Sequence, residues 1–201
     1  MLIDGVYYAL GLAAGGLVVS WLTRPVWGLP LFLLALFCLW FFRDPEREIP
    51  AGDVAVSPAD GKVVAIRHDP AGLTRISIFL NIFDVHVNRS PIAGKITDVR
   101  YQPGKFLVAS REEASSDNEM NTITVEGDAT TVVFKQIAGL IARRVICWKK
   151  PGDAVKLGER VGYIKFGSRV DVLLGPEWEI AVAEGARVSG GASIIARRLK
   201  S

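Results

Sequence analysis

Two uncharged apolar runs near the start of the chain constrain its fold more than any other feature. They span residues 5–22 and 25–42, with one charge, Arg24, between them. Each run has about the minimum length for a helix that crosses a bilayer. Tryptophans lie near the ends of the runs, where amphipathic rings favour the membrane interface. We therefore expect residues 1–42 to form a membrane-associated helical hairpin, either spanning or re-entrant.

The residues that flank these runs bear on orientation. A cleaved signal peptide begins with a positively charged segment, whereas residues 1–4 carry no positive charge. Two prolines weaken the second run as a full span. Arg43 and Arg47 follow it and favour the cytoplasmic side of the cell membrane for the rest of the chain, although Arg24 acts in the opposite sense.

Composition narrows the class of the remaining chain. Half of the 201 residues are hydrophobic, and the excess lies in the first 42 positions, so about 160 residues remain to build a soluble core. The net charge is +3, and no basic run alternates with aromatic residues, which argues against a nucleic-acid partner. Two cysteines, Cys38 and Cys147, are too few for a disulfide framework and fit a reducing compartment or buried thiols.

Beyond a polar linker at residues 43–53, the pattern changes to short β-type runs broken by Gly, Pro, Asn and Asp. No long helical period appears between residues 54 and 201, so we expect a mainly β, antiparallel, barrel- or sandwich-like domain. A polar interruption at residues 110–120 indicates either a loop or a lid. The predicted strands are Lys62–Arg67, Arg75–Phe83, Lys95–Tyr101, Asn121–Glu126, Thr131–Ile137, Ile141–Trp148 and Val161–Phe166.

The glycine spacing in residues 150–162 resembles the turns of biotinyl- and lipoyl-carrier domains. Those carriers present a modifiable lysine at a hairpin tip, whereas the hairpin that follows here presents Gly167-Ser168. The resemblance therefore implies a carrier-like scaffold without the carrier's lysine.

Three segments carry residues suited to catalysis. The stretch Tyr163–Leu174 predicts two strands that meet at a tight Gly167-Ser168 corner. The segment SPADGKV places Asp60 in a turn before a strand, and NIFDVHVNRSP places His86 within an apolar run. Taken singly, each is typical of an ordinary turn or core residue.

Together and in this order, these segments resemble the phosphatidylserine decarboxylase proenzymes in their short form. The resemblance covers nearly the whole chain, from the apolar start through Arg43-Asp44-Pro45, SPADGKV, NIFDVHVNRSP and the GKF at 104–106 to the FGS corner. The long form has a Leu-Gly-Ser-Thr corner, whereas this chain reads Phe-Gly-Ser-Arg. That difference is the reason for the short-form assignment.

The resemblance implies a self-cleaving enzyme. Ser168 would attack the carbonyl of Gly167, with His86 as general base and Asp60 orienting it. Cleavage would give a β chain, 1–167, and an α chain, 168–201, whose Ser168 becomes a covalent pyruvoyl cofactor. Its carbonyl would form a Schiff base with phosphatidylserine and take up the electrons left by CO2, giving phosphatidylethanolamine in phospholipid biosynthesis. His86 would protonate the resulting carbanion.

Two other functions remain open at this point. One is a membrane-anchored serine hydrolase that uses Ser168, His86 and Asp60 as a standing triad, and the other is a non-catalytic carrier domain. The second histidine, His68, lies in a polar turn and is expected to face solvent. We expect no metal site, because two His and two Cys are too scattered for ligand spacing. The expected partners are the membrane, the chain's own two fragments and a phospholipid with either acyl-ester or isoprenoid-ether tails.

Overall fold

The computed structural model describes residues 2–70, 72–104, 118–139, 144–165 and 168–199. The chain divides into two compact units, residues 1–46 and 47–201. Parts of the predicted loop at 110–120 and of the strand Ile141–Trp148, together with Phe166 and Gly167, lie outside the described residues.

The first unit consists of two apolar helices, α1 (Ile3–Leu22) and α2 (Pro25–Phe41). Pro25 starts α2, where its missing N–H would have had no helical partner in any case. The helices pack closely at Gly28, because a Cβ there would collide with the Gly16 carbonyl oxygen. This pair confirms the predicted apolar helices at the N-terminus.

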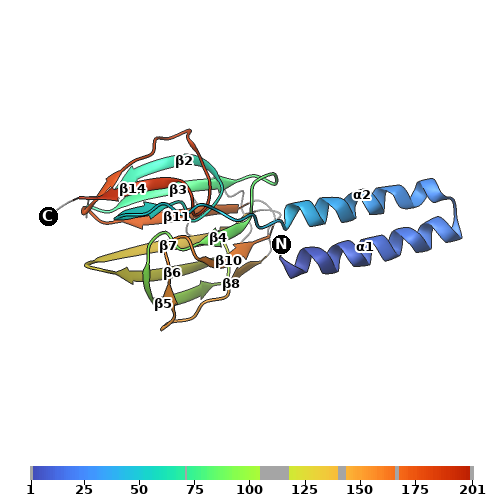
Figure 1. The fold of residues 1–201 in the computed structure, drawn as a ribbon, viewed down its shortest axis with the longest axis horizontal. Helices are drawn as coiled ribbons and strands as arrows, with labels where there is room; N and C mark the ends of the chain where they lie inside the picture. The colour runs from blue at the N-terminus through green and yellow to red at the C-terminus, as the bar shows by residue number, and fades with distance from the viewer. Residues whose placement is uncertain (1, 71, 105–117, 140–143, 166–167, 200–201) are drawn as a thin grey trace. The chain divides into compact units, whose positions relative to one another are not determined.

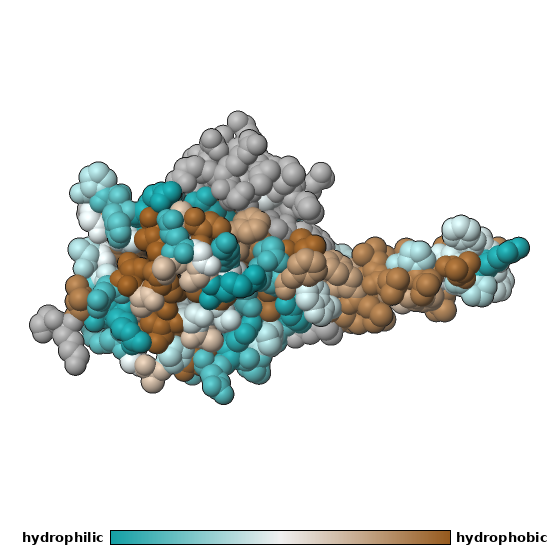
Figure 2. Space-filling model, turned by 90° about the horizontal axis from the view of Figure 1, so that it is seen from above, coloured by the Kyte–Doolittle hydropathy of each residue, from teal (hydrophilic) through white to brown (hydrophobic). Residues whose placement is uncertain are grey.

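The surface of the helical unit is mainly hydrophobic, as the brown colouring in Figure 2 shows. Among the described residues, α1 is the one helix long and apolar enough to cross a membrane, whereas α2 has 17 residues. Signal sequences and buried core helices can have the same length and composition. α1 is therefore compatible with membrane association.

The second unit is built from short strands, as predicted. They are β1 (Val54–Val56), β2 (Gly61–His68), β3 (Thr74–Leu80), β4 (Val87–Arg89), β5 (Gly94–Gln102), β6 (Met120–Gly127), β7 (Thr130–Ala138), β8 (Val145–Cys147), β9 (Ala154–Val155), β10 (Arg160–Ile164), β11 (Ser168–Leu174), β12 (Trp178–Ile180), β13 (Arg187–Val188) and β14 (Ile194–Arg198).

The strands form one large sheet and two small ones (Figure 1). The large sheet has the order β13-β2-β3-β11-β7-β6-β5-β9, and the small sheets have the orders β4-β10-β8 and β1-β14-β12. All pairings among the described strands are antiparallel. Register shifts in β2 and β5 mark bulges, which increase local twist and help to curl the large sheet. The predicted mainly β, antiparallel class is thus confirmed.

One strand boundary differs from the prediction in a way that matters for the site. The apolar run Arg75–Phe83 suggested a strand through Phe83, but β3 ends at Leu80. Asn81 Oδ1 accepts a hydrogen bond of 2.7 Å from Phe83 N, and Asp84 N donates to Asn81 O at 3.0 Å. These local bonds replace the ladder with a turn, as Asn and Asp side chains commonly do.

β11 is buried on both faces of the large sheet. Val170 and Val172 point into the main hydrophobic core. Arg169 and Asp171 alternate with them and lie on the opposite face, with side-chain exposures of 2% and 1%. Arg169 donates to Asp171 through Nε at 2.6 Å and through Nη2 at 3.0 Å. This two-point pairing satisfies charges that would otherwise be costly to bury.

Candidate active site

The candidate site lies at a corner where three neighbouring strands pass from the large sheet into a small one. β3, β11 and β7 are adjacent in the large sheet, and β4, β10 and β8 are adjacent in the small sheet in the same order. Each strand of one trio is joined along the chain to a strand of the other: β3 to β4, β7 to β8, and β10 to β11. The connection between β10 and β11 is the central one, and it leads directly into Ser168.

Ser168 is the first residue of β11 and lies between two neighbouring strands. It is paired with Leu80 of β3 and Ala138 of β7. Its side chain lies on the core face with Val170 and is fully buried. Within the described residues, Ser168 Oγ has no hydrogen-bond partner. An unpaired buried hydroxyl is costly and calls for an explanation such as a reactive role.

His86 lies close to this corner, in the connection between β3 and β4. Its backbone oxygen accepts a hydrogen bond of 3.2 Å from Ile164 N, four residues before Ser168. The ring is 2% exposed, and Nδ1 lies 2.9 Å from the backbone oxygen of Asp84. Because a carbonyl can only accept, this contact assigns the proton of the neutral ring to Nδ1. Nε2 is then the basic nitrogen, as a general base requires.

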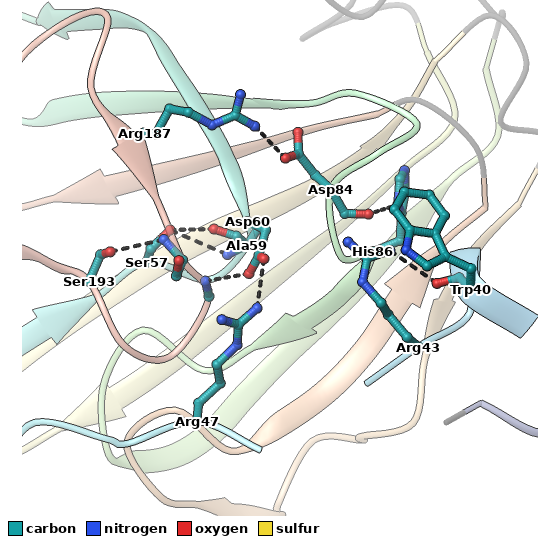
Figure 3. Close-up of polar contacts among 12 residues, drawn as sticks. Trp40, Arg43, Arg47, Ser57, Ala59, Asp60, Asp84, His86, Arg187 and Ser193 are labelled. Carbon is teal, nitrogen blue, oxygen red and sulfur yellow. Dashed lines mark hydrogen bonds and ion pairs between the residues drawn. The ribbon is translucent and has the colours of Figure 1, made fainter. Parts of the chain in front are cut away.

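Asp60 lies two strands away from Ser168 along the same edge of the large sheet. It precedes β2, which pairs with β3, and β3 pairs with β11. At the usual strand spacing, its backbone is about 10 Å from that of Ser168. The carboxylate accepts hydrogen bonds of 2.7 Å from Arg47 Nη2 and of 2.7 Å from Gly190 N (Figure 3). The structure therefore pairs Asp60 with Arg47 and Gly190, and not with His86.

The protonation of Asp60 reflects competing influences. Burial raises the pKa of its carboxyl above the ordinary value, and the negative charge of Asp84 adds to the increase. The Gly190 N–H and the Arg47 guanidinium act in the opposite direction, but the net shift in pKa is upward. Asp60 is thus a buried carboxyl group whose charged form is favoured by the Gly190 N–H and by the Arg47 guanidinium.

Asp84 is a candidate that the sequence analysis quoted within a motif but gave no role. Its Oδ1 accepts a hydrogen bond of 2.6 Å from Arg187 Nη2, and its Oδ2 accepts one of 2.9 Å from Asn81 N. Figure 3 shows Asp84 between Arg187 and His86. Its position two residues before His86 was the available signal, since its backbone oxygen contacts that ring.

A second group that the sequence analysis missed is a row of buried side-chain amides inside the same corner. Asn121 Nδ2 donates to Gln136 Oε1 at 3.3 Å, and Gln136 Nε2 donates to Asn88 Oδ1 at 2.8 Å. Asn88 and Gln136 are fully buried, and Asn121 is 5% exposed. Inward-facing amides in otherwise apolar strands were the available signal.

The remaining predictions concern Gly167, His68, the two cysteines and metal binding. Gly167 lies outside the described residues. His68 is exposed, as expected, with Nδ1 2.9 Å from Thr74 Oγ1. Cys38 and Cys147 are both free thiols. Within the described ranges, no group of three or more His, Cys, Asp or Glu side chains is arranged to hold a metal ion.

Comparison with known proteins decides between the classes that the geometry allows. The family model for phosphatidylserine decarboxylase matches residues 34–196. The chain is also 69% identical to a phosphatidylserine decarboxylase proenzyme from Solibacter usitatus (strain Ellin6076) over 195 residues, which cover 97% of this chain and 95% of the relative. The chain belongs to the phosphatidylserine decarboxylase family. Membership confirms the resemblance noted in the sequence and the predicted enzyme class, a decarboxylase.

The matched region contains every candidate named above. Residues 34–196 include Asp60, Asp84, His86, the buried amides and Ser168. The matched relative is called a proenzyme, a word that implies processing before activity.

Proposed function

We propose that the chain decarboxylates phosphatidylserine to phosphatidylethanolamine after cutting itself between Gly167 and Ser168. The observation that carries the proposal is the environment of Ser168, whose buried Oγ has no hydrogen-bond partner among the described residues. The 69% identical proenzyme and the family match support the same reaction. A standing hydrolase triad has less support, because the Asp60 carboxylate bonds to Arg47 and Gly190.

The self-cleavage uses only residues of this chain and one water. His86 Nε2 takes the proton from Ser168 Oγ, which attacks the Gly167 carbonyl carbon. The peptide C–N bond breaks as its nitrogen gains a proton, and an ester forms. Removal of the Ser168 α-proton then breaks the Cβ–Oγ bond, leaving a carboxylate on Gly167 and a dehydroalanine at position 168. Water hydrolyses the dehydroalanine, ammonia leaves, and a pyruvoyl group remains.

The fold supports a product made of two chains held together without a covalent link. β11 begins at the proposed cut and lies between β3 and β7, which pair with it over most of its length. The segment after the cut also supplies β13, which pairs with β2, and β14, which pairs with β1. Because these strand pairings join residues before the cut to residues after it, the β chain 1–167 and the α chain 168–201 would remain one folded unit.

The residues at the corner fit a pyruvoyl group at position 168. The group supplies an electrophilic carbonyl that binds the substrate amine and takes up the electrons left by CO2. Ser168 is buried beside Leu80 and Ala138, so the carbonyl would lie in an environment that excludes bulk water. His86 Nε2 would deliver a proton to the carbon that loses CO2. Asp60 would influence the electrostatics of the site through its ion pair with Arg47, and not through a direct contact with His86.

The substrate also explains the N-terminal helices. A phospholipid remains in a bilayer, so an enzyme that acts on its headgroup benefits from an anchor. α1 has the length and composition for this, and the arginines at 43 and 47 favour the cytoplasmic side for the strand-rich unit.

The experiment that tests the reaction measures CO2 release from vesicles that contain phosphatidylserine. The wild type should release CO2 and form phosphatidylethanolamine, whereas Ser168→Ala should do neither. A serine-reactive phosphonate should label position 168 in neither protein, because Ser168 is converted to a pyruvoyl group in the mature wild type and is replaced in Ser168→Ala. Labelling of the wild type with loss of an esterase activity would support a hydrolase instead.

A further inference from the structure

The row of buried amides ends in a hydrogen-bond donor that has no partner. Asn121 donates to Gln136, and Gln136 donates to Asn88. Since Gln136 and Asn88 use their oxygens to accept, Asn88 Nδ2 is the donor at the end of the row. Within the described residues, Asn88 Nδ2 and Ser168 Oγ are both buried side-chain atoms without a hydrogen-bond partner. A buried, unpaired amide N–H is as costly as a buried, unpaired hydroxyl.

The sheet register and a hydrogen bond place both unpaired groups next to Gln136. Ala138 is paired with Ser168, and Gln136 lies two residues before Ala138 on the same face of β7. Diagonal neighbours of this kind in adjacent strands lie about 7–8 Å apart, within reach of a long side chain. Gln136 Nε2 in turn contacts Asn88 Oδ1 at 2.8 Å. Ser168 and Asn88 are therefore both neighbours of Gln136 in the same buried corner.

The charge on this side of β11 is also distinctive. Ser168, Gln136 and Asn88 are neutral, and Arg169 lies on the opposite face and is bonded to Asp171. The charged group nearest to Ala138 is the buried Glu119, whose Oε1 accepts a hydrogen bond from Val145 N. A cation beside a carboxylate would stabilise the charge that decarboxylation must remove, and so would favour the ground state over the transition state. A neutral amide donor can hold a carboxylate in place with less of that penalty.

We propose that Asn88 Nδ2 is the hydrogen-bond donor for the carboxylate of the substrate headgroup, positioned by Gln136 and Asn121. The inference rests on the proposed function, because it requires that the headgroup amine is bound at position 168. Amine and carboxylate are attached to the same carbon of a serine headgroup, so a carboxylate bound there lies within a few ångströms of residue 168. Asn88 thus selects a headgroup that carries a carboxylate beside its amine.

The test separates recognition of the carboxylate from recognition of the amine. Phosphatidylethanolamine in nonionic detergent micelles is incubated with the mature enzyme and cyanoborohydride, and attachment of the lipid to fragment 168–201 is followed by mass. A competing lipid carries glycerate in place of serine, and so has the carboxylate but no amine. In the wild type it should compete with attachment. In Asn88→Ala its inhibition constant should rise about tenfold or more, while half-saturation by phosphatidylethanolamine stays within about twofold.

Asn118→Ala is the matched control. Asn118 is also a fully buried asparagine near the corner, but its Nδ2 already donates to Ala138 O at 2.7 Å. Any effect of this change should alter amine attachment and glycerate competition by the same factor. Equal changes of both in Asn88→Ala, or unchanged competition, would overturn the proposal.

Failure of Asn88→Ala to mature and failure of the wild type to cleave are interpreted differently. If Asn88→Ala fails to fold or mature, the nearly isosteric Asn88→Asp is used, and glycerate competition should be lost while amine attachment persists. Failure of both variants to cleave would assign Asn88 to maturation and overturn a role in substrate selection. If the wild type itself gives no fragment and no lipid attachment, the proposed function fails, and the result says nothing specific against Asn88.

Discussion

Arg47 Nη2 donates a hydrogen bond of 2.7 Å to Asp60 Oδ2, and the two side chains are 20% and 16% exposed. Asp60 also accepts from Gly190 N. In the triad expected from the sequence, the partner of Asp60 would have been His86. Because Asp60 is instead bound to Arg47, the ion pair between them exists only while the Asp60 carboxyl group is charged.

The first prediction concerns how stability depends on pH. Burial raises the pKa of Asp60 in the folded state, so the folded protein binds this proton more tightly than the unfolded chain. The contribution of Asp60 to the free energy of unfolding is therefore greatest below its usual pKa of about 4 and falls as pH rises through the raised pKa. We expect Asp60→Asn to lack this fall. Unfolding in detergent, measured against pH in an uncleavable Ser168→Ala background, tests it.

Arg47→Met sharpens that test. Removal of the guanidinium should raise the pKa of Asp60 further, so the fall in stability should extend to higher pH than in the wild type. The same unfolding measurement applies. Identical pH profiles for Arg47→Met and the wild type would mean that the ion pair does not control the ionisation of Asp60.

The second prediction concerns Gly61, which follows Asp60. Its φ is +152°, and a Cβ there would collide with the carbonyl oxygen of Phe79. Gly61→Ala should force β2 away from β3 and lower the free energy of unfolding by about 1–3 kcal/mol. Gly152→Ala is the control, because Gly152 also has a positive φ, +100°, but nothing lies within 4 Å. Equal losses in both variants would show that the close approach to Phe79 contributes nothing.

The third prediction separates the two histidines. His86→Ala should accumulate uncleaved precursor, with slow residual cleavage because a general base contributes about 10²–10⁴-fold. His68→Ala should mature and decarboxylate normally, since His68 is exposed at the end of β2. A gel time course with parallel CO2 measurement distinguishes them. Normal maturation and normal CO2 release in His86→Ala would show that His86 is not the base that activates Ser168. Prompt cleavage without CO2 release would confine the role of His86 to decarboxylation.

The fourth prediction concerns the N-terminal helices. Removal of residues 5–42 should move the protein from the membrane pellet to the supernatant and leave self-cleavage intact, because the candidate residues all lie beyond Arg47. Fractionation in high salt followed by a denaturing gel measures both properties. Continued pelleting would place the anchor elsewhere, and loss of cleavage would make the helices part of the folding unit.

The longer strands could be predicted from the sequence, whereas the shortest could not. Runs such as Thr131–Ile137 alternate clearly and form β7 with one added residue at each end. β9 and β13 have two residues each, too few to show any period. β3 ended earlier than its apolar residues suggested, because Asn81 forms a turn through its side chain.

The sequence motifs indicate candidate residues for the site, but they could not predict the contacts of those residues. The motifs indicated Ser168 and His86, and the structure places both at one corner through the pairing of Ser168 with Leu80 and the bond from Ile164 to His86. The partner of Asp60 was not predictable, because Gly190 lies 130 positions further along the chain. The pairing of Asn88 with Gln136 likewise joins strands from different sheets.

The most direct test of self-cleavage at Ser168 is the intact mass of the purified protein under denaturing conditions. The wild type should give two chains, 1–167 and 168–201, the second about one sixth of the whole. The small chain should be lighter than a fragment that begins with serine by the mass of one ammonia molecule. A pyruvoyl group differs from an N-terminal serine by the loss of NH3. Ser168→Ala should give one uncut chain. A fully active wild type of a single mass would contradict the account.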